Sequence, residues 1–126
     1  MELSEFTILI ADDDLSLLKI YEKSLSVEGY RLILVVNDKR ALAELGKTPK
    51  DLLILDHGVL TILPLIELDY PKLPVIVVSG NYEGLMKDYE KKGFANVKVF
   101  YVKPESMDVI KQKIREILKI EDFQDR

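Results

Sequence analysis

Hydrophobic residues along this chain alternate between short continuous runs and longer stripes with helical spacing. Continuous runs of four to six mostly apolar residues are typical of strands buried on both faces of a parallel sheet. The runs cover Thr7–Ala11, Arg31–Val36, Leu52–Leu55, Val75–Gly80 and Val97–Val102. We therefore predict five strands.

Between the runs, apolar residues recur every three or four positions, which is the pattern of amphipathic helices. The stripes are Leu17, Leu18, Tyr21 and Leu25; Ala41–Leu45; Tyr82, Leu85, Met86 and Tyr89; and Met107, Ile110, Ile114, Ile117 and Leu118. Gly29, Gly46 and Gly93 follow the first three stripes and are expected to end those helices.

A further apolar segment, Val59 to Leu68, predicts a third helix that differs from the others. Pro64 lies inside it, and Pro71 and Pro74 follow it. A proline in a helix interior removes one hydrogen bond and clashes with the preceding turn. We therefore expect a shortened third helix of only about two turns.

Five strands alternating with five helices predict an α/β fold with three layers, a doubly wound parallel sheet and right-handed crossovers. The common order for five such strands is 2-1-3-4-5. The chain has 126 residues, of which 48% are hydrophobic, and this is sufficient for one core. We expect a single domain over residues 1–126.

In that strand order, polar residues at the carboxyl ends of four strands meet at one edge of the sheet, where open α/β sheets bind ligands. They are Asp12 and Asp13, Asp56, Ser79 and Lys103, and they follow or end the first, third, fourth and fifth strands. Any one of them alone could be an ordinary turn or surface residue. Together they predict one pocket. Asp14 is expected only to cap the following helix.

The predicted pocket suits phosphoryl transfer with a divalent cation. Clustered carboxylates repel one another unless a cation intervenes. Magnesium prefers oxygen ligands and keeps several waters, so a pair of carboxylates from Asp12, Asp13 and Asp56 with a backbone carbonyl near Gly58 would suffice. Zinc is poorly supported, because the chain has no cysteine and one histidine. Asp56 would be the nucleophile, and Lys103 and Ser79 would contact the phosphoryl group.

Four segments of the chain resemble the successive signatures of CheY-like response regulator receiver domains. They are Ile8–Asp14, Leu53–Asp56, Val77–Gly80 and Phe100–Pro104, and the resemblance extends over nearly the whole chain. It implies a flavodoxin-like fold and a phosphoacceptor function in two-component signalling, in which Asp56 takes a phosphoryl group from a histidine kinase or phosphotransfer protein.

The resemblance also assigns roles to individual residues. Asp13 and Asp56 would be magnesium ligands, Asp12 a ligand through water, Ser79 and Lys103 phosphate contacts, and Phe100 the aromatic residue of the switch. The sequence departs from the family at two positions after the acceptor. The family's usual proline is Leu60 here, and its loop-closing glycine is Pro64.

Composition excludes several other classes of function. Lys and Arg number 18 and Asp and Glu 22, and this net charge of -4 has the wrong sign for general nucleic-acid binding. No apolar run approaches the length of a membrane span, and the first residues lack a basic region. The absence of cysteine fits a reducing compartment. We expect a cytoplasmic protein, a monomer or weak dimer, whose output is a contact with a downstream protein.

Three functions are compatible with the pocket to different degrees. A phosphoacceptor switch, which is not an enzyme in the usual sense, requires all the pocket residues, and all are present. A pseudo-receiver, acting as a phosphorylation-independent interaction module, predicts a broken pocket. A small magnesium-dependent phosphatase needs a general acid two residues after the nucleophile, where Gly58 stands. The first hypothesis is preferred.

Overall fold

The computed structural model describes residues 3–56, 59–80, 87, 94–103 and 106–120 of this chain. A short 3-10 turn, Leu3–Glu5, precedes the first strand. The strands and helices are β1 (Thr7–Ala11), α1 (Leu15–Ser26), β2 (Arg31–Val35), α2 (Asp38–Leu45), β3 (Leu52–Leu55), α3 (Val59–Asp69), β4 (Val75–Ser79), β5 (Val97–Val102) and α5 (Met107–Leu118). The helix predicted around Tyr82 to Tyr89 falls outside the described residues.

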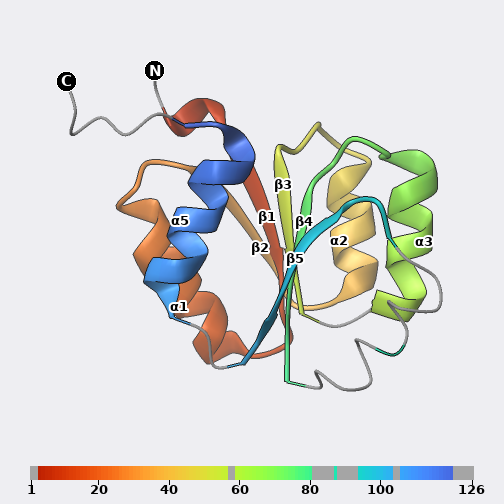
Figure 1. Cartoon of the computed structure of the whole chain (residues 1–126), viewed down its shortest axis with the longest axis horizontal. Helices are drawn as coiled ribbons and strands as arrows, with labels where there is room; N and C mark the ends of the chain where they lie inside the picture. The colour runs from red at the N-terminus through yellow and green to blue at the C-terminus, as the bar shows by residue number, and fades with distance from the viewer. Residues whose placement is uncertain (1–2, 57–58, 81–86, 88–93, 104–105, 121–126) are drawn as a thin grey trace.

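The five strands form one parallel sheet in the order β2-β1-β3-β4-β5, as the sequence predicted. Helices α1 and α5 cover one face of the sheet, and α2 and α3 cover the other (Figure 1). The register pairs Ala11 with both Val35 and Leu55, and Leu55 with Val77. The carboxyl ends of the central strands therefore lie at one level.

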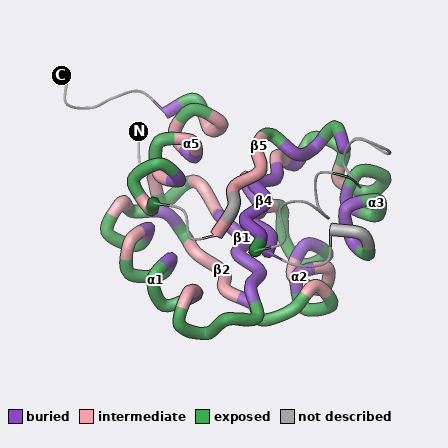
Figure 2. Tube along the Cα trace, turned by 60° about the horizontal axis from the view of Figure 1, so that its bottom comes forward, coloured by how far each residue is buried: buried purple, intermediate pink, exposed green. Residues whose placement is uncertain are grey.

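Both faces of the central strands are buried, which explains why their sequences are continuous apolar runs. Leu9 and Leu53 pack toward α2 and α3, whereas Ile8 and Ile54 pack toward α1 and α5. Figure 2 shows β1 and β4 as buried segments at the centre of the molecule. The core thus consists of two apolar layers separated by the sheet.

Helix α3 corrects the expectation of a shortened third helix. It has 11 residues, about three turns rather than two, and Pro64 lies inside it. Its residues Ile62, Leu63 and Ile66 are 2%, 1% and 0% exposed. Burial of each such side chain stabilises the folded state by about 1.5–3 kcal/mol. The three side chains together therefore outweigh the roughly 3 kcal/mol cost of a proline in the helix interior.

Two other boundaries also differ from the predictions. Strand β2 ends at Val35, and α2 begins at Asp38 rather than Ala41. The earlier start has a local cause, because the Asn37 side chain caps the helix and accepts a hydrogen bond from the Arg40 N–H at 2.8 Å. None of the helices within the described ranges is both long and apolar enough to cross a bilayer.

Candidate functional site

The backbone places the predicted site residues at the carboxyl edge of the sheet. The sheet hydrogen bonds continue past the ends of the strands: Asp12 N–H donates to Val35 at 3.1 Å, and Asp56 N–H donates to Ala11 at 2.9 Å. Lys103 N–H donates in the same way to the Ser79 carbonyl at 3.0 Å. These bonds hold the residues that follow β1, β3 and β5 in fixed positions.

Lys103 connects the two buried carboxylates of the site. Its Nζ lies 2.7 Å from Asp56 Oδ1 and 3.1 Å from Asp12 Oδ2. Asp12 and Asp56 are only 3% and 2% exposed. Burial lowers the pKa of the Lys103 ammonium, but its hydrogen bonds to Asp56 and Asp12 and their charges outweigh this effect and raise the pKa above its usual value. Lys103 therefore stays charged, and its ammonium links the ends of β1 and β3 to the end of β5.

Three aspartates converge closely enough to hold a metal ion. Asp12, Asp13 and Asp56 each offer a carboxylate oxygen, and these oxygens lie within 4.8 Å of one another. Asp13 is exposed, and the other two are buried. The Asp12 carboxylate is oriented by the Asp14 N–H, which donates to its Oδ1 at 2.8 Å. A donor set of three carboxylates beside one ammonium fits a hard divalent cation.

No protein-family model matches the chain, but curated proteins and solved structures do. A response regulator described as NtrX-like from Rickettsia felis is 30% identical over 129 residues, covering 88% of this chain and 27% of that protein. The chain thus spans about a quarter of the length of the curated relatives it matches.

Solved structures with the same fold include a CheY-like response regulator receiver domain protein from Methanospirillum hungatei. Its TM-score is 0.77 at 24% identity, over 90% of this chain and 94% of that one. The BeF3-activated DrrB receiver domain gives a TM-score of 0.76 at 20% identity, over 94% and 99% of the two chains.

The chain has the fold of a CheY-like response regulator receiver domain. The resemblance inferred from the four sequence segments is confirmed.

The remaining predicted residues divide into those that the structure places and those outside the described ranges. Ser79 ends β4 at the carboxyl edge and is 6% exposed. Phe100 is partly buried against the core layer under α2 and α3, whereas Tyr101 packs against the opposite layer. Gly58 and Pro104 lie outside the described residues.

Sequence reasoning missed two residues beside the site. Asp38, at the start of α2, lines a hollow of about 140 Å³ together with Asp12 and Asp13. Asp38 could have been predicted in the same way as Asp12 and Asp56, as a polar residue that closely follows the end of a strand, here β2. Tyr21 was predicted only as part of a helical stripe. Burial, and then the charges of Asp12 and Asp56, raises the pKa of its hydroxyl, so Tyr21 stays neutral beside the carboxylates.

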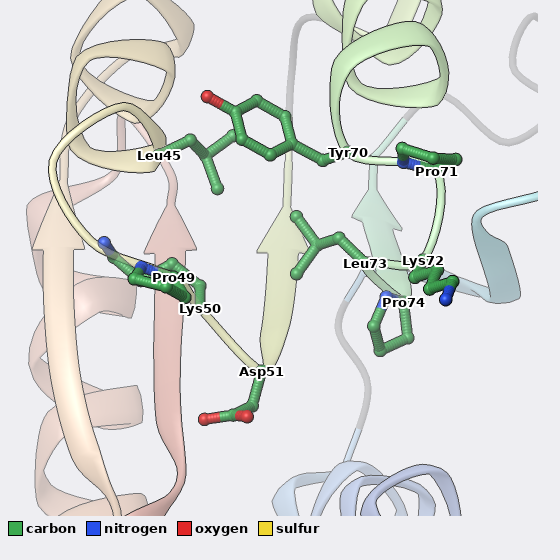
Figure 3. Close-up of a pocket in the computed structure, with 9 residues that line it drawn as sticks. All are labelled: Leu45, Pro49, Lys50, Asp51, Tyr70, Pro71, Lys72, Leu73 and Pro74. Carbon is green, nitrogen blue, oxygen red and sulfur yellow. The ribbon is translucent and has the colours of Figure 1, made fainter.

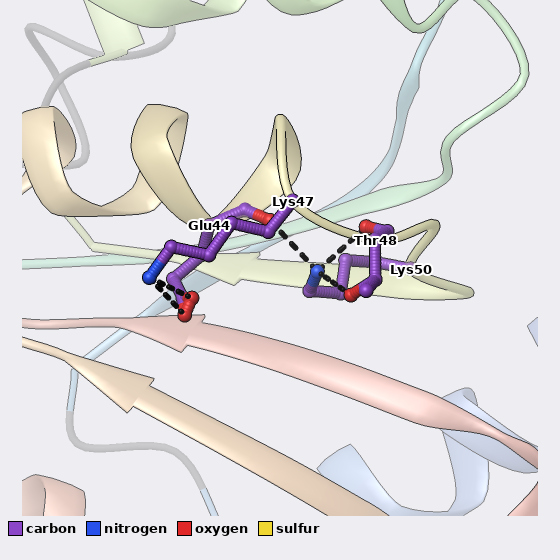
Figure 4. A network of polar contacts seen from close by, with 4 residues as sticks. All are labelled: Glu44, Lys47, Thr48 and Lys50. Carbon is purple, nitrogen blue, oxygen red and sulfur yellow. Dashed lines mark hydrogen bonds and ion pairs between the residues drawn. The ribbon is translucent and has the colours of Figure 1, made fainter.

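A larger hollow of about 410 Å³ lies at the opposite edge of the sheet, near the start of β3 and β4 (Figure 3). Its polar groups hold loops together. Lys50 Nζ donates to the Glu44 and Thr48 carbonyls at 2.8 and 2.6 Å (Figure 4), and Asp51 Oδ2 accepts from Thr7 N–H at 2.7 Å. These contacts have a structural explanation and lie away from the acidic site.

Proposed function

We propose that this chain is the phosphoacceptor domain of a two-component His-Asp phosphorelay, and that residues 1–126 form one receiver domain. The supporting observation is the environment of Asp56. This nearly inaccessible carboxylate shares its edge of the sheet with two other aspartates and with Lys103. The donor would be a histidine kinase or a phosphotransfer protein.

In the proposed reaction, a carboxylate oxygen of Asp56 attacks the phosphorus of a phosphohistidine. An O–P bond forms, the P–N bond breaks, and the leaving imidazole nitrogen takes the electron pair. Magnesium, held by Asp12, Asp13 and Asp56, would supply charge neutralisation for the phosphoryl oxygens. Lys103 lies 2.7 Å from Asp56 Oδ1, so a small movement transfers its ammonium from the carboxylate to the phosphoryl group. The Ser79 hydroxyl, at the end of β4, would donate a hydrogen bond to that group.

The proposed output is a change in a protein-binding surface. The phosphoryl group carries about -1.5 to -2 charges, but the Asp56 carboxylate loses its own negative charge when the O–P bond forms, so the site gains about -0.5 to -1 charge together with three acceptor oxygens. This change can shift a two-state equilibrium that a downstream protein reads. We propose a cytoplasmic monomer or weak dimer with no direct contact to nucleic acid. The chain corresponds to about a quarter of the length of its curated relatives. We therefore propose only that the downstream partner is a protein.

The test is phosphorylation by a small phosphodonor in the presence of magnesium. Intact-mass measurement should show one added acid-labile phosphoryl group in the parent protein and none in Asp56→Asn. Asp14→Asn is a matched control: Asp14 is a neighbouring aspartate whose side chain caps α1, and this variant should still react.

Each alternative outcome has a defined meaning. A phosphoryl group that remains in Asp56→Asn would refute Asp56 as the acceptor. A parent protein that binds magnesium but never reacts, even with phosphorylated histidine kinase, would instead support the pseudo-receiver function.

A further inference from the structure

The hollow beside Asp12 and Asp13 extends away from the three clustered aspartates toward the start of α2. It has a volume of about 140 Å³ and is lined by Ala11, Asp12, Asp13, Val36, Asn37 and Asp38. It has room for several ordered waters and offers them polar partners on both sides. A magnesium ion at the three aspartates would keep several waters in its shell, and waters need hydrogen-bond acceptors.

Asp38 is held beside this hollow by a residue that is distant in the sequence. Its Oδ2 accepts a hydrogen bond from Thr61 Oγ1 at 2.7 Å, and its Oδ1 accepts from Lys39 N–H at 3.1 Å. Thr61 belongs to the first turn of α3, which follows Asp56 and β3 in the chain. The Asp38–Thr61 contact therefore ties the starts of two helices together next to the phosphoacceptor.

A simpler explanation covers only part of this arrangement. An acidic side chain in the first turn of a helix interacts favourably with the helix dipole, and Asp38 stands in the first turn of α2. Asp108 is likewise an acidic residue in the first turn of α5, and it lines a different hollow, with Tyr101 and Lys113. Dipole stabilisation explains both aspartates. It does not explain why Asp38 is anchored by a hydroxyl from α3 at the hollow that Asp12 and Asp13 also line.

We propose that Asp38, positioned by Thr61, is an outer-sphere partner of the cation site formed by Asp12, Asp13 and Asp56. Its carboxylate accepts hydrogen bonds from cation-bound water in the hollow and adds a fourth negative charge to the site. Such second-layer acceptors orient the inner ligands and strengthen metal binding. The inference rests on the magnesium site of the proposed function and deepens it, because Asp38 would tune how strongly that site depends on the cation.

Magnesium titration monitored by amide chemical shifts tests the inference without any phosphorylation step. At constant ionic strength, Asp38→Asn should raise the dissociation constant of magnesium roughly two- to fivefold, the range expected for a solvent-bridged charge. Asp108→Asn makes the same change in the first turn of another helix and should leave the constant unchanged. Thr61→Val keeps the Asp38 charge but removes its anchor, so it should weaken magnesium binding, whereas Thr61→Ser should not.

The outcomes separate this inference from the proposed function. Equal magnesium affinities for Asp38→Asn and Asp108→Asn would overturn the role of Asp38. Parent-like affinity in Thr61→Val would overturn the positioning role of Thr61. Urea denaturation without magnesium is the structural control: both Asn variants should remain folded, because asparagine still offers a side-chain oxygen as a hydrogen-bond acceptor, and only Asp38→Asn should lose affinity for magnesium. If the parent protein binds magnesium but is not phosphorylated, the proposed function fails, and the variants still decide this inference.

Discussion

Replacing Lys103 by methionine tests the electrostatics of the site most directly. The substitution removes the ammonium that contacts Asp56 and Asp12 at 2.7 and 3.1 Å and keeps most of the aliphatic side chain. Two carboxylates that are 2% and 3% exposed would then face each other without that cation. We expect the variant to fold but to be less stable than the parent protein.

The magnitude follows from burial. Removing one partner of a fully buried ion pair costs about 3–5 kcal/mol. The Lys103 side chain is 24% exposed and Asp13 beside it is exposed, so solvent screening reduces the cost to about 1–3 kcal/mol. For a chain of 126 residues, this corresponds to a fall in Tm of roughly 4–11 °C.

Magnesium should restore much of this stability, because a divalent cation at the three aspartates replaces the lost ammonium charge. Ligand binding to the native state alone stabilises by about 2.7 kcal/mol at a concentration one hundred times the dissociation constant. Urea denaturation at pH 7.5 with and without saturating magnesium is the assay. Lys113→Met is a suitable control, since Lys113 forms a surface ion pair with Glu116 at 3.0 Å, away from the acidic site. Its stability should depend on magnesium as the parent's does.

Two results would refute this reasoning. If Lys103→Met were as stable as the parent protein without magnesium, the ammonium would not be compensating the buried carboxylates. If the variant were destabilised by the same amount with and without saturating magnesium, the cation would not be replacing the lost ammonium charge.

Three further predictions concern the scaffold and the pH dependence. Asp14→Ala should cost about 0.5–2 kcal/mol in urea denaturation, because the side chain accepts hydrogen bonds from two N–H groups at the start of α1, at 2.9 and 3.2 Å. Asn96→Ala should cost about 2–4 kcal/mol, because this 2% exposed side chain donates to two carbonyls at 2.9 and 2.8 Å and its loss leaves them without those bonds; thermal denaturation measures it. The pKa of Lys103 is raised in the folded protein, so its contribution to stability is present below the usual lysine pKa of about 10.4 and is lost as the pH rises through the raised pKa. The fall in stability as the pH rises above about 10.4 should therefore be smaller in Lys103→Met.

Much of this protein could be predicted from its sequence because the relevant signals are local. Strands buried on both faces are mostly apolar, so the runs at Leu52–Leu55 and Val75–Gly80 were visible in the sequence, and the structure forms β3 and β4 there. Because crossovers between parallel strands are right-handed, only a few strand orders are possible for such a sheet. Once the order was inferred, Asp12, Asp56 and Lys103 had to meet at one edge.

Other features were decided only by tertiary structure. Helix α3 continues through Pro64 because Ile62 and Ile66 are buried against the sheet, and a local rule about proline cannot include that packing energy. Pairing between side chains is also non-local. The two contacts of Lys103 depend on the register of three strands, and the Asp38–Thr61 hydrogen bond joins positions 23 residues apart in different helices. Sequence patterns report which residues are buried and with what period, whereas the partner of each polar atom depends on how the finished layers pack together.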